Sequence, residues 1–226
     1  MATTSSITTK DYTEIVLIRH GETDWNITNK IQGQLDIELN EFGKEQASAV
    51  ANRLSKEPKF SAIYSSDLKR ALETAQTITN SCGKLEVVQD KDLRERHFGD
   101  LQGYVLDQSA KRSNASKLKP EAYKAYKTGN VIPGGGETVD QFHKRCIAAV
   151  QKIGEKHKGE RVVVVTHGGV IKELQKKTEA KKKRWESVEN ASVSVIQLAG
   201  DGEWVIQLWD DARHLEDLGA AEGFEF

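Results

Sequence analysis

Residues 15–21, IVLIRHG, decide the fold that this chain is expected to adopt, and residues 162–169, VVVVTHGG, repeat their pattern. In both stretches a run of apolar, mostly β-branched residues ends in a histidine and a glycine, which predicts two buried parallel strands. Ligands bind at the carboxyl edge of an open α/β sheet. Either histidine alone is more typical of a packing residue, but the matching flanks favour one site that contains both His20 and His167. The glycine after each histidine is expected to let a substrate approach the backbone closely.

The rest of the chain continues the alternation of strands and helices. Strands are predicted at Ile15–Ile18, Phe60–Tyr64, Leu85–Gln89 and Val162–Val165. Helical patterns lie between them, with predicted N-caps at Asn40, Asp67 and Thr138. Alternating residues at Val193–Leu198 and Trp204–Trp209 predict an antiparallel hairpin at one sheet edge. The predicted fold is therefore an α/β, three-layer α/β/α sandwich around a mainly parallel mixed sheet.

Length and composition bound the organisation and the partners. With 226 residues and 37% hydrophobic content, we expect a disordered segment over 1–12 and a single domain over 13–226. The polar stretch at about 104–133 is expected to form a lid-like insertion. A formal net charge of −1 gives no overall field for nucleic acid or anionic membranes. No run reaches the roughly 18 apolar residues of a membrane span, and no secretory signal is evident. We expect a cytoplasmic monomer or homodimer.

The sequence predicts neither a metal site nor a disulfide. Cys82 and Cys146 have no metal-ligand spacing, and Cys146 falls on the apolar stripe of a predicted helix, which favours a buried free thiol. The six histidines show no two-histidine helix spacing. No metal and no cofactor is therefore expected.

The residue before the first histidine indicates the type of ligand. A guanidinium at Arg19 favours the neutral form of the neighbouring His20 imidazole. A neutral nitrogen beside a cation suits attack on an anion that the cation holds, and phosphate is the obvious anion. A small phosphorylated metabolite is the expected partner.

The sequence resembles a known family, the histidine phosphatase superfamily of phosphoglycerate mutase-like proteins. The resemblance rests on four blocks that come in the family order. They comprise Arg19–Thr23 with Asn26, Gln32 and Gly33; Ser65–Leu68 with Arg70, Ala71, Thr74 and Ala75; Leu93, Glu95, Phe98, Gly99, Gln102 and Gly103; and Thr166–Gly169. The resemblance implies a phosphoglycerate mutase-like fold.

The resemblance also implies roles for three catalytic residues. His20 would be the nucleophile that takes the phosphoryl group as a phosphohistidine. His167 would stabilise charge on the phosphoryl oxygens. Glu95 would protonate the leaving alkoxide and later accept a proton from water. A surface salt bridge of Glu95 with Arg94 or Arg96 is the competing interpretation.

Further residues are expected to bind phosphate or substrate. Arg19 and Arg70 offer planar forks to phosphate oxygens, although Arg70 would also suit a surface ion pair. The remaining expectations are Asn26 as a donor, Gly168 through a free helix-terminal N–H, and Gln32, Gly33 and Tyr104 as substrate contacts. Asn26 is equally suited to cap the segment over residues 27–30. Specificity is expected to lie in the insertion, around Tyr104, Lys111, Tyr123 and Tyr126.

The motifs favour a phosphatase over a mutase. Lys111, Arg112 and Ser113 only faintly resemble the paired-arginine motif of the family's mutases, and no proline run follows them. The ending over 209–215, WDDARHL, looks more like that of phosphatase members. The sequence thus predicts a metal-independent phosphomonoesterase for phosphoserine or a sugar or acid phosphate. A cofactor-dependent phosphoglycerate mutase and a non-catalytic interaction module are the alternatives.

Overall fold

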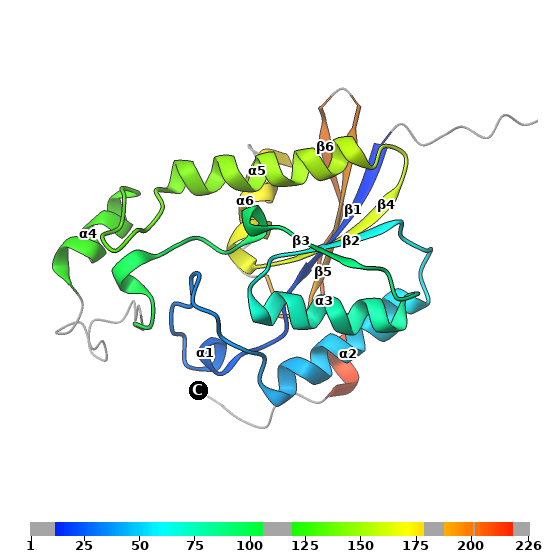
Figure 1. The fold of residues 1–226 in the computed structure, drawn as a ribbon, viewed down its shortest axis with the longest axis horizontal. Coiled ribbons are helices and arrows are strands. Elements are labelled where there is room, and N and C mark those ends of the chain that lie inside the picture. Colours follow the sequence, from blue (N-terminus) through cyan, green and yellow to red (C-terminus); the bar gives the residue numbers. More distant parts are fainter. Residues whose placement is uncertain (1–11, 106–118, 179–187, 201, 219–226) are drawn as a thin grey trace, which may run out of the picture.

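A computed structural model describes residues 12–105, 119–178, 188–200 and 202–218. Within these residues one sheet has six strands in the order β3-β2-β4-β1-β5-β6 (Figure 1). The strands are β1 Tyr12–Arg19, β2 Ala62–Ser65, β3 Val87–Gln89, β4 Arg161–Thr166, β5 Val193–Ala199 and β6 Trp204–Asp211. β1 to β4 are mutually parallel, and β5 and β6 form the predicted antiparallel hairpin at one edge.

Helices cover both faces of the sheet, which confirms the predicted three-layer sandwich (Figure 1). The elements are α1 Asp24–Ile27, α2 Glu41–Ser55, α3 Lys69–Ser81, α4 Pro120–Thr128, α5 Val139–Lys156 and α6 Gly168–Thr178, with 3-10 turns at Lys91–Leu93, Gly99–Leu101 and Arg213–Leu218. Side chains alternate along a strand, so Ile15 and Leu17 of β1 pack with α5 and α6. Val16 and Ile18 pack with α2 and α3 on the other face. The central strands are therefore buried on both sides.

Two of the three predicted helix caps are confirmed and one is wrong. Asn40 caps α2 through Gly43 N–H (2.7 Å), and Thr138 opens α5 with a capping box. Asp67 caps nothing, because both of its carboxylate oxygens accept hydrogen bonds from Arg94 (2.6 Å each). The α3 helix instead begins at Lys69, whose backbone N–H donates to the carboxylate of Asp36 in the loop before α2 (2.7 Å).

Other predictions fall partly outside the described residues. Tyr12 already belongs to β1, whereas the rest of the predicted N-terminal segment is not described. The predicted insertion contains α4, and Ala122 and Ile132 pack with Leu101 in a small cluster of their own. Residues 106–118, with Lys111, Arg112 and Ser113, lie outside the described residues. Cys146 is buried and free, as predicted. Among the helices described, none is long and apolar enough to cross a membrane.

Candidate active site

The sheet register brings the two predicted histidines together. Arg19 of β1 pairs with Thr166 of β4, so the residue that follows each strand lies at the same edge. His20 N–H donates to the Thr166 carbonyl (2.9 Å). The rings of His20 and His167 lie edge to face, with centroids 5.1 Å apart. Two segments about 150 residues apart in the chain thus meet in one site, as their matching flanks predict.

The surroundings of the His20 ring fix its protonation state. Its Nδ1 lies 2.6 Å from the Gly21 carbonyl oxygen, which can only accept a hydrogen bond, so Nδ1 carries the proton. Burial, followed by the charges of Arg70 and Arg19, holds the pKa of His20 well below its usual range. The ring is therefore neutral at neutral pH, and Nε2 keeps its lone pair.

The His167 ring is held by a serine that the sequence analysis did not assign to the site. His167 Nε2 lies 2.9 Å from Ser66 Oγ. Ser66 directly follows β2, the strand beside β4. Burial and the charge of Arg70 are the main causes that keep the pKa of His167 well below its usual range. When Ser66 donates its proton to Nε2, the ring proton lies on Nδ1, which is buried and has no hydrogen-bond partner among the described residues.

Two arginines lie beside the histidines, Arg70 buried and Arg19 half-buried, and each has unused hydrogen-bonding capacity. Arg70 is 1% exposed and donates to the carbonyls of Gly33 (2.8 Å) and Leu35 (2.9 Å). Arg19 donates to the Val188 carbonyl. The Nε atom of each arginine is buried and has no partner among the described residues. Burial lowers the pKa of Arg70 to about 10, which leaves the side chain charged at neutral pH. Arg70 does not form the surface ion pair that was its alternative interpretation.

The Glu95 carboxylate is fixed by backbone amides. Arg96 N–H donates to one oxygen (2.8 Å), and Gly169 N–H, in the first turn of α6, donates to the other (3.0 Å). A side chain at position 169 would collide with this carboxylate, because a Cβ there would lie 2.1 Å from Glu95 Oε1. The competing interpretation, a salt bridge with Arg94 or Arg96, is wrong: Arg94 pairs with Asp67, and Arg96 donates to the Glu137 carbonyl.

A half-buried ion pair supports the loop that carries Glu95. Arg145 of α5 forms a two-point pair with Glu137 (2.8 Å each). The same guanidinium donates to the carbonyls of Asp92 and Arg94 (2.8 Å each) and of Glu95 (3.2 Å). Ser66, Glu137 and Arg145 were all missed as site residues, and only Ser66 lies within a block of the family resemblance. Long-range contacts of this kind leave no periodic signal in a sequence.

The expected role of Gly21 is not what the structure shows. A Cβ at Gly21 would lie 2.3 Å from the Gly43 carbonyl oxygen, so this glycine lets α2 approach the loop after β1. Gly21 does not line the cavity that His20, Arg19 and Arg70 share, and neither does His167, whose ring lies behind that of His20. The glycines after His167 do line it, but a Cβ at either would meet Arg19 or Glu95. The glycines thus allow close packing of the protein's own groups.

The remaining predicted residues lie at or near one cavity of about 320 Å³. Its lining combines the predicted residues Arg19, His20, Asn26, Gln32, Gly33, Arg70, Glu95 and Gly168 with the cations Lys30 and Lys172, which were not predicted. Asn26 lies inside α1, where its side-chain oxygen completes a capping box with Thr23, so it does not cap residues 27–30. Tyr104 does not line the cavity. The Tyr104 carbonyl instead accepts a hydrogen bond from Ile31 N–H (2.9 Å), and this bond holds the loop over residues 30–33, which lines the cavity.

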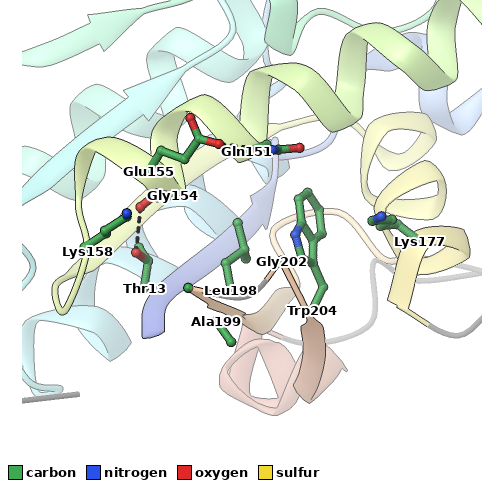
Figure 2. Close-up of a pocket in the computed structure, with 11 residues that line it drawn as sticks. Thr13, Gln151, Gly154, Glu155, Lys158, Lys177, Leu198, Ala199, Gly202 and Trp204 are labelled. Atoms are coloured by element: carbon green, nitrogen blue, oxygen red, sulfur yellow. Dashed lines mark hydrogen bonds between the residues drawn. The ribbon is translucent and has the colours of Figure 1, made fainter. Parts of the chain in front are cut away.

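A different cavity, of about 510 Å³, lies at the opposite end of β1 (Figure 2). Figure 2 shows Leu198 and Trp204 of the hairpin near Gln151 and Glu155 of α5, with Thr13 donating to the Gly154 carbonyl (2.7 Å). None of the residues predicted to bind or transfer phosphate lines it. The buried histidines and the unpaired arginine nitrogens therefore single out the smaller cavity as the functional one.

A neutral, buried histidine beside the guanidinium groups of Arg19 and Arg70 suits an enzyme that acts on phosphoryl groups. Residues 15–212 match the histidine phosphatase superfamily (branch 1), and the chain belongs to this family. It is 55% identical over 212 residues to phosphoglycerate mutase-like protein 4 of Arabidopsis thaliana, covering 92% of this chain and 90% of that protein. A metal-independent phosphoserine phosphatase of the same plant is 45% identical over 219 residues, covering 95% and 89%.

The fold is also that of solved family members. The crystal structure of a phosphoglycerate mutase from Bacillus anthracis superimposes with a TM-score of 0.76 at 29% identity, covering 92% of this chain and 97% of that one. This agreement confirms the phosphoglycerate mutase-like fold that the sequence blocks imply.

Proposed function

We propose that this protein is a metal-independent phosphomonoesterase that hydrolyses small phosphorylated metabolites through a phosphohistidine at His20. Phosphoserine and sugar or acid phosphates are the proposed substrates, and a location in the cytoplasm is part of the proposal. One observation carries it: Arg19 Nε, Arg70 Nε and His167 Nδ1 are buried without partners among the described residues. Unpaired buried N–H groups are costly, and a phosphate dianion supplies the acceptors that would satisfy all three.

In the first step the His20 Nε2 lone pair attacks phosphorus and the bond to the ester oxygen breaks. Arg19 and Arg70 hold the phosphoryl oxygens, and His167 donates from Nδ1 to the charge that develops on them. Glu95, in its protonated form, gives its proton to the leaving alkoxide. The products are the free alcohol and a phosphohistidine.

In the second step water attacks the phosphohistidine. The Glu95 carboxylate accepts a proton from this water, the N–P bond breaks, and inorganic phosphate and neutral His20 are restored. The same glutamate thereby serves as acid and then as base. The positive charge that a metal ion supplies in other phosphoryl-transfer enzymes comes here from guanidinium groups.

Support for a phosphatase also comes from the relative named as a metal-independent phosphoserine phosphatase. The phosphoglycerate mutase names of the other relative and of the crystal structure keep mutase activity as the second candidate. The two activities differ in whether water or a second substrate hydroxyl takes the phosphoryl group.

The test is turnover of phosphoserine and of 3-phosphoglycerate, with and without 2,3-bisphosphoglycerate, in the presence of a metal chelator. We expect phosphate release that the chelator leaves unchanged. Formation of 2-phosphoglycerate faster than release of phosphate would identify a mutase. A protein that turns over neither these esters nor an aryl phosphate would be a non-catalytic module.

A further inference from the structure

A second cavity adjoins the phosphate-binding cavity across Glu95. It has a volume of about 350 Å³ and shares Glu95, Phe98, Gly169 and Lys172 with the first. His20, Arg19 and Arg70 line only the first cavity. The carboxylate proposed as the acid thus lies on the boundary between a phosphate cavity and a cavity of different composition.

This boundary position fixes the side toward which the alcohol part of a substrate extends. In phosphoryl transfer the attacking and leaving atoms lie roughly in line on opposite sides of phosphorus. The leaving oxygen must also be within reach of the acid that protonates it. His20 lines only the first cavity and Glu95 lies at its boundary with the second, so the carbon skeleton behind a leaving oxygen near Glu95 is directed into the second cavity.

Rings form the wall of this second cavity. Phe98, Tyr126 and Phe142 line it, and the centroids of Phe98 and Tyr126 are 6.0 Å apart. The Arg96 guanidinium lies over both rings, at 5.4 and 5.9 Å from their centroids. Because Arg96 also donates to the Glu137 carbonyl, the stack is tied to the loop that carries Glu95.

Two buried charged groups that line the second cavity, Glu173 and Arg96, already have partners. Glu173 is 7% exposed, lies 3.0 Å from His143 Nδ1 and pairs with Lys176. Arg96 is bonded to backbone and stacked on rings. No lining atom of this cavity is among the buried, unpartnered atoms found in the described part of the chain. The first cavity presents unpaired N–H groups, whereas the second presents apolar surface.

We propose that the second cavity binds the alcohol part of the substrate and that the enzyme prefers phosphomonoesters whose alcohol carries an apolar, ring-sized body. This inference rests on the proposed phosphatase function. The body packs against Phe98, Tyr126 and Phe142, where burial of apolar area and aromatic contact both favour it. Small polar esters such as phosphoserine occupy the phosphate cavity but leave these rings unused.

The test compares 3-phenylpropyl phosphate with propyl phosphate. Both have a primary alkanol as leaving group, so the need for protonation by Glu95 is the same and the ratio of kcat/KM reports the phenyl ring alone. We expect a ratio of at least about tenfold in favour of the phenyl ester. 3-Phenylpropanol is expected to inhibit phosphoserine hydrolysis competitively, and propanol at the same concentration is not.

Variants of α4 locate the effect. Tyr126→Ala is expected to lower the ratio of kcat/KM for the two esters several-fold, because it removes one ring of the cavity wall. Tyr123→Ala is the matched control, because Tyr123 lies on the same helix but is 43% exposed and does not line the cavity. Tyr126 also packs against the small cluster of Leu101, Ala122 and Ile132, so its loss could affect folding as well. A second variant is therefore Val139→Asn, which makes a 38% exposed lining position polar. It is expected to lower the ratio as well.

A ratio near one, or a ratio that neither Tyr126→Ala nor Val139→Asn lowers, would overturn the inference and leave the phosphatase function intact. An equal loss in Tyr123→Ala would also overturn it. Failure to hydrolyse any ester, phosphoserine included, would instead contradict the proposed function.

Discussion

Buried histidines lie at both edges of the sheet, and their surroundings differ. At the amino edge, His157 directly follows α5, and both of its ring nitrogens have partners: Tyr64 OH at 2.9 Å and Glu160 at 2.6 Å. At the carboxyl edge, His167 Nδ1 and two arginine Nε atoms are buried without partners among the described residues. Burial alone therefore does not separate a packing histidine from a functional one. The two histidines differ in their hydrogen bonding: both ring nitrogens of His157 have partners, whereas His167 Nδ1 has none among the described residues.

The sharpest test of this contrast removes one histidine from each edge. His20→Ala is expected to lower turnover by at least about 10³-fold, because no other group replaces the nucleophile. Acid-labile phosphate labelling of the protein is expected to vanish with it. His157→Ala is expected to leave turnover within about threefold of the parent protein. Labelling that persists in His20→Ala would show that another residue is the nucleophile.

A second comparison uses two arginines that both bind backbone carbonyls. Arg70→Lys is expected to lower kcat/KM for phosphoserine by about 100-fold, since the single tetrahedral nitrogen of lysine cannot reproduce the planar spread of N–H groups that reaches two loop carbonyls and a phosphate. Arg53→Lys is the control, because Arg53 donates to the Asp211 carbonyl far from the cavity. Equal losses in the two variants would assign Arg70 a purely structural role.

The acid role of Glu95 is tested by the leaving group. Glu95→Gln is expected to slow alkyl phosphates about tenfold or more relative to aryl phosphates, because only alkoxides need a proton. The amide cannot accept from both Arg96 N–H and Gly169 N–H, so some loss is expected for every ester. The ratio between the two classes is therefore the informative measurement. Uniform slowing would contradict the acid role.

At the amino edge the expected effect is on stability. Tyr64→Phe removes the hydroxyl that pairs with His157 Nε2 and is expected to lower the free energy of unfolding by about 1 kcal/mol. Denaturant unfolding measures this change, and turnover is the control that should not move. A variant as stable as the parent but impaired in catalysis would reverse the assignment of the two edges.

The smallest expected effects are those of pH. The lowered pKa of His20 and His167 means that the folded state binds fewer protons than the unfolded state below about pH 6.5. Stability is therefore expected to fall as the pH drops below this value and to be insensitive to these groups above it. NMR titration of the ring protons checks the cause directly. A titration midpoint near 6.5 for either ring would contradict it.

The strands were predictable because their signals are local. Runs of β-branched residues identified β1 and β4, and the Thr138 capping box lies within four residues of sequence. Asp67 shows where local signals fail. It precedes a helix as a cap would, but Arg94, 27 residues away, binds both of its oxygens. Gly21 was misread for the same reason, since its close neighbour Gly43 lies on α2.

By itself the sequence determined where the candidate residues lie relative to the strands. One histidine follows each of two buried strands, an arginine precedes the first histidine, and Glu95 lies in a loop that follows β3. These follow from residue types and short spacings, which the chain carries without folding. Only the tertiary structure decided which hydrogen-bonding groups remain unpaired, that Ser66 contacts His167 and Arg145 holds the loop of Glu95, and that rings from α4 and α5 adjoin Glu95. Pairing between distant segments depends on packing in three dimensions, because each group selects its partner from all those that the fold brings near.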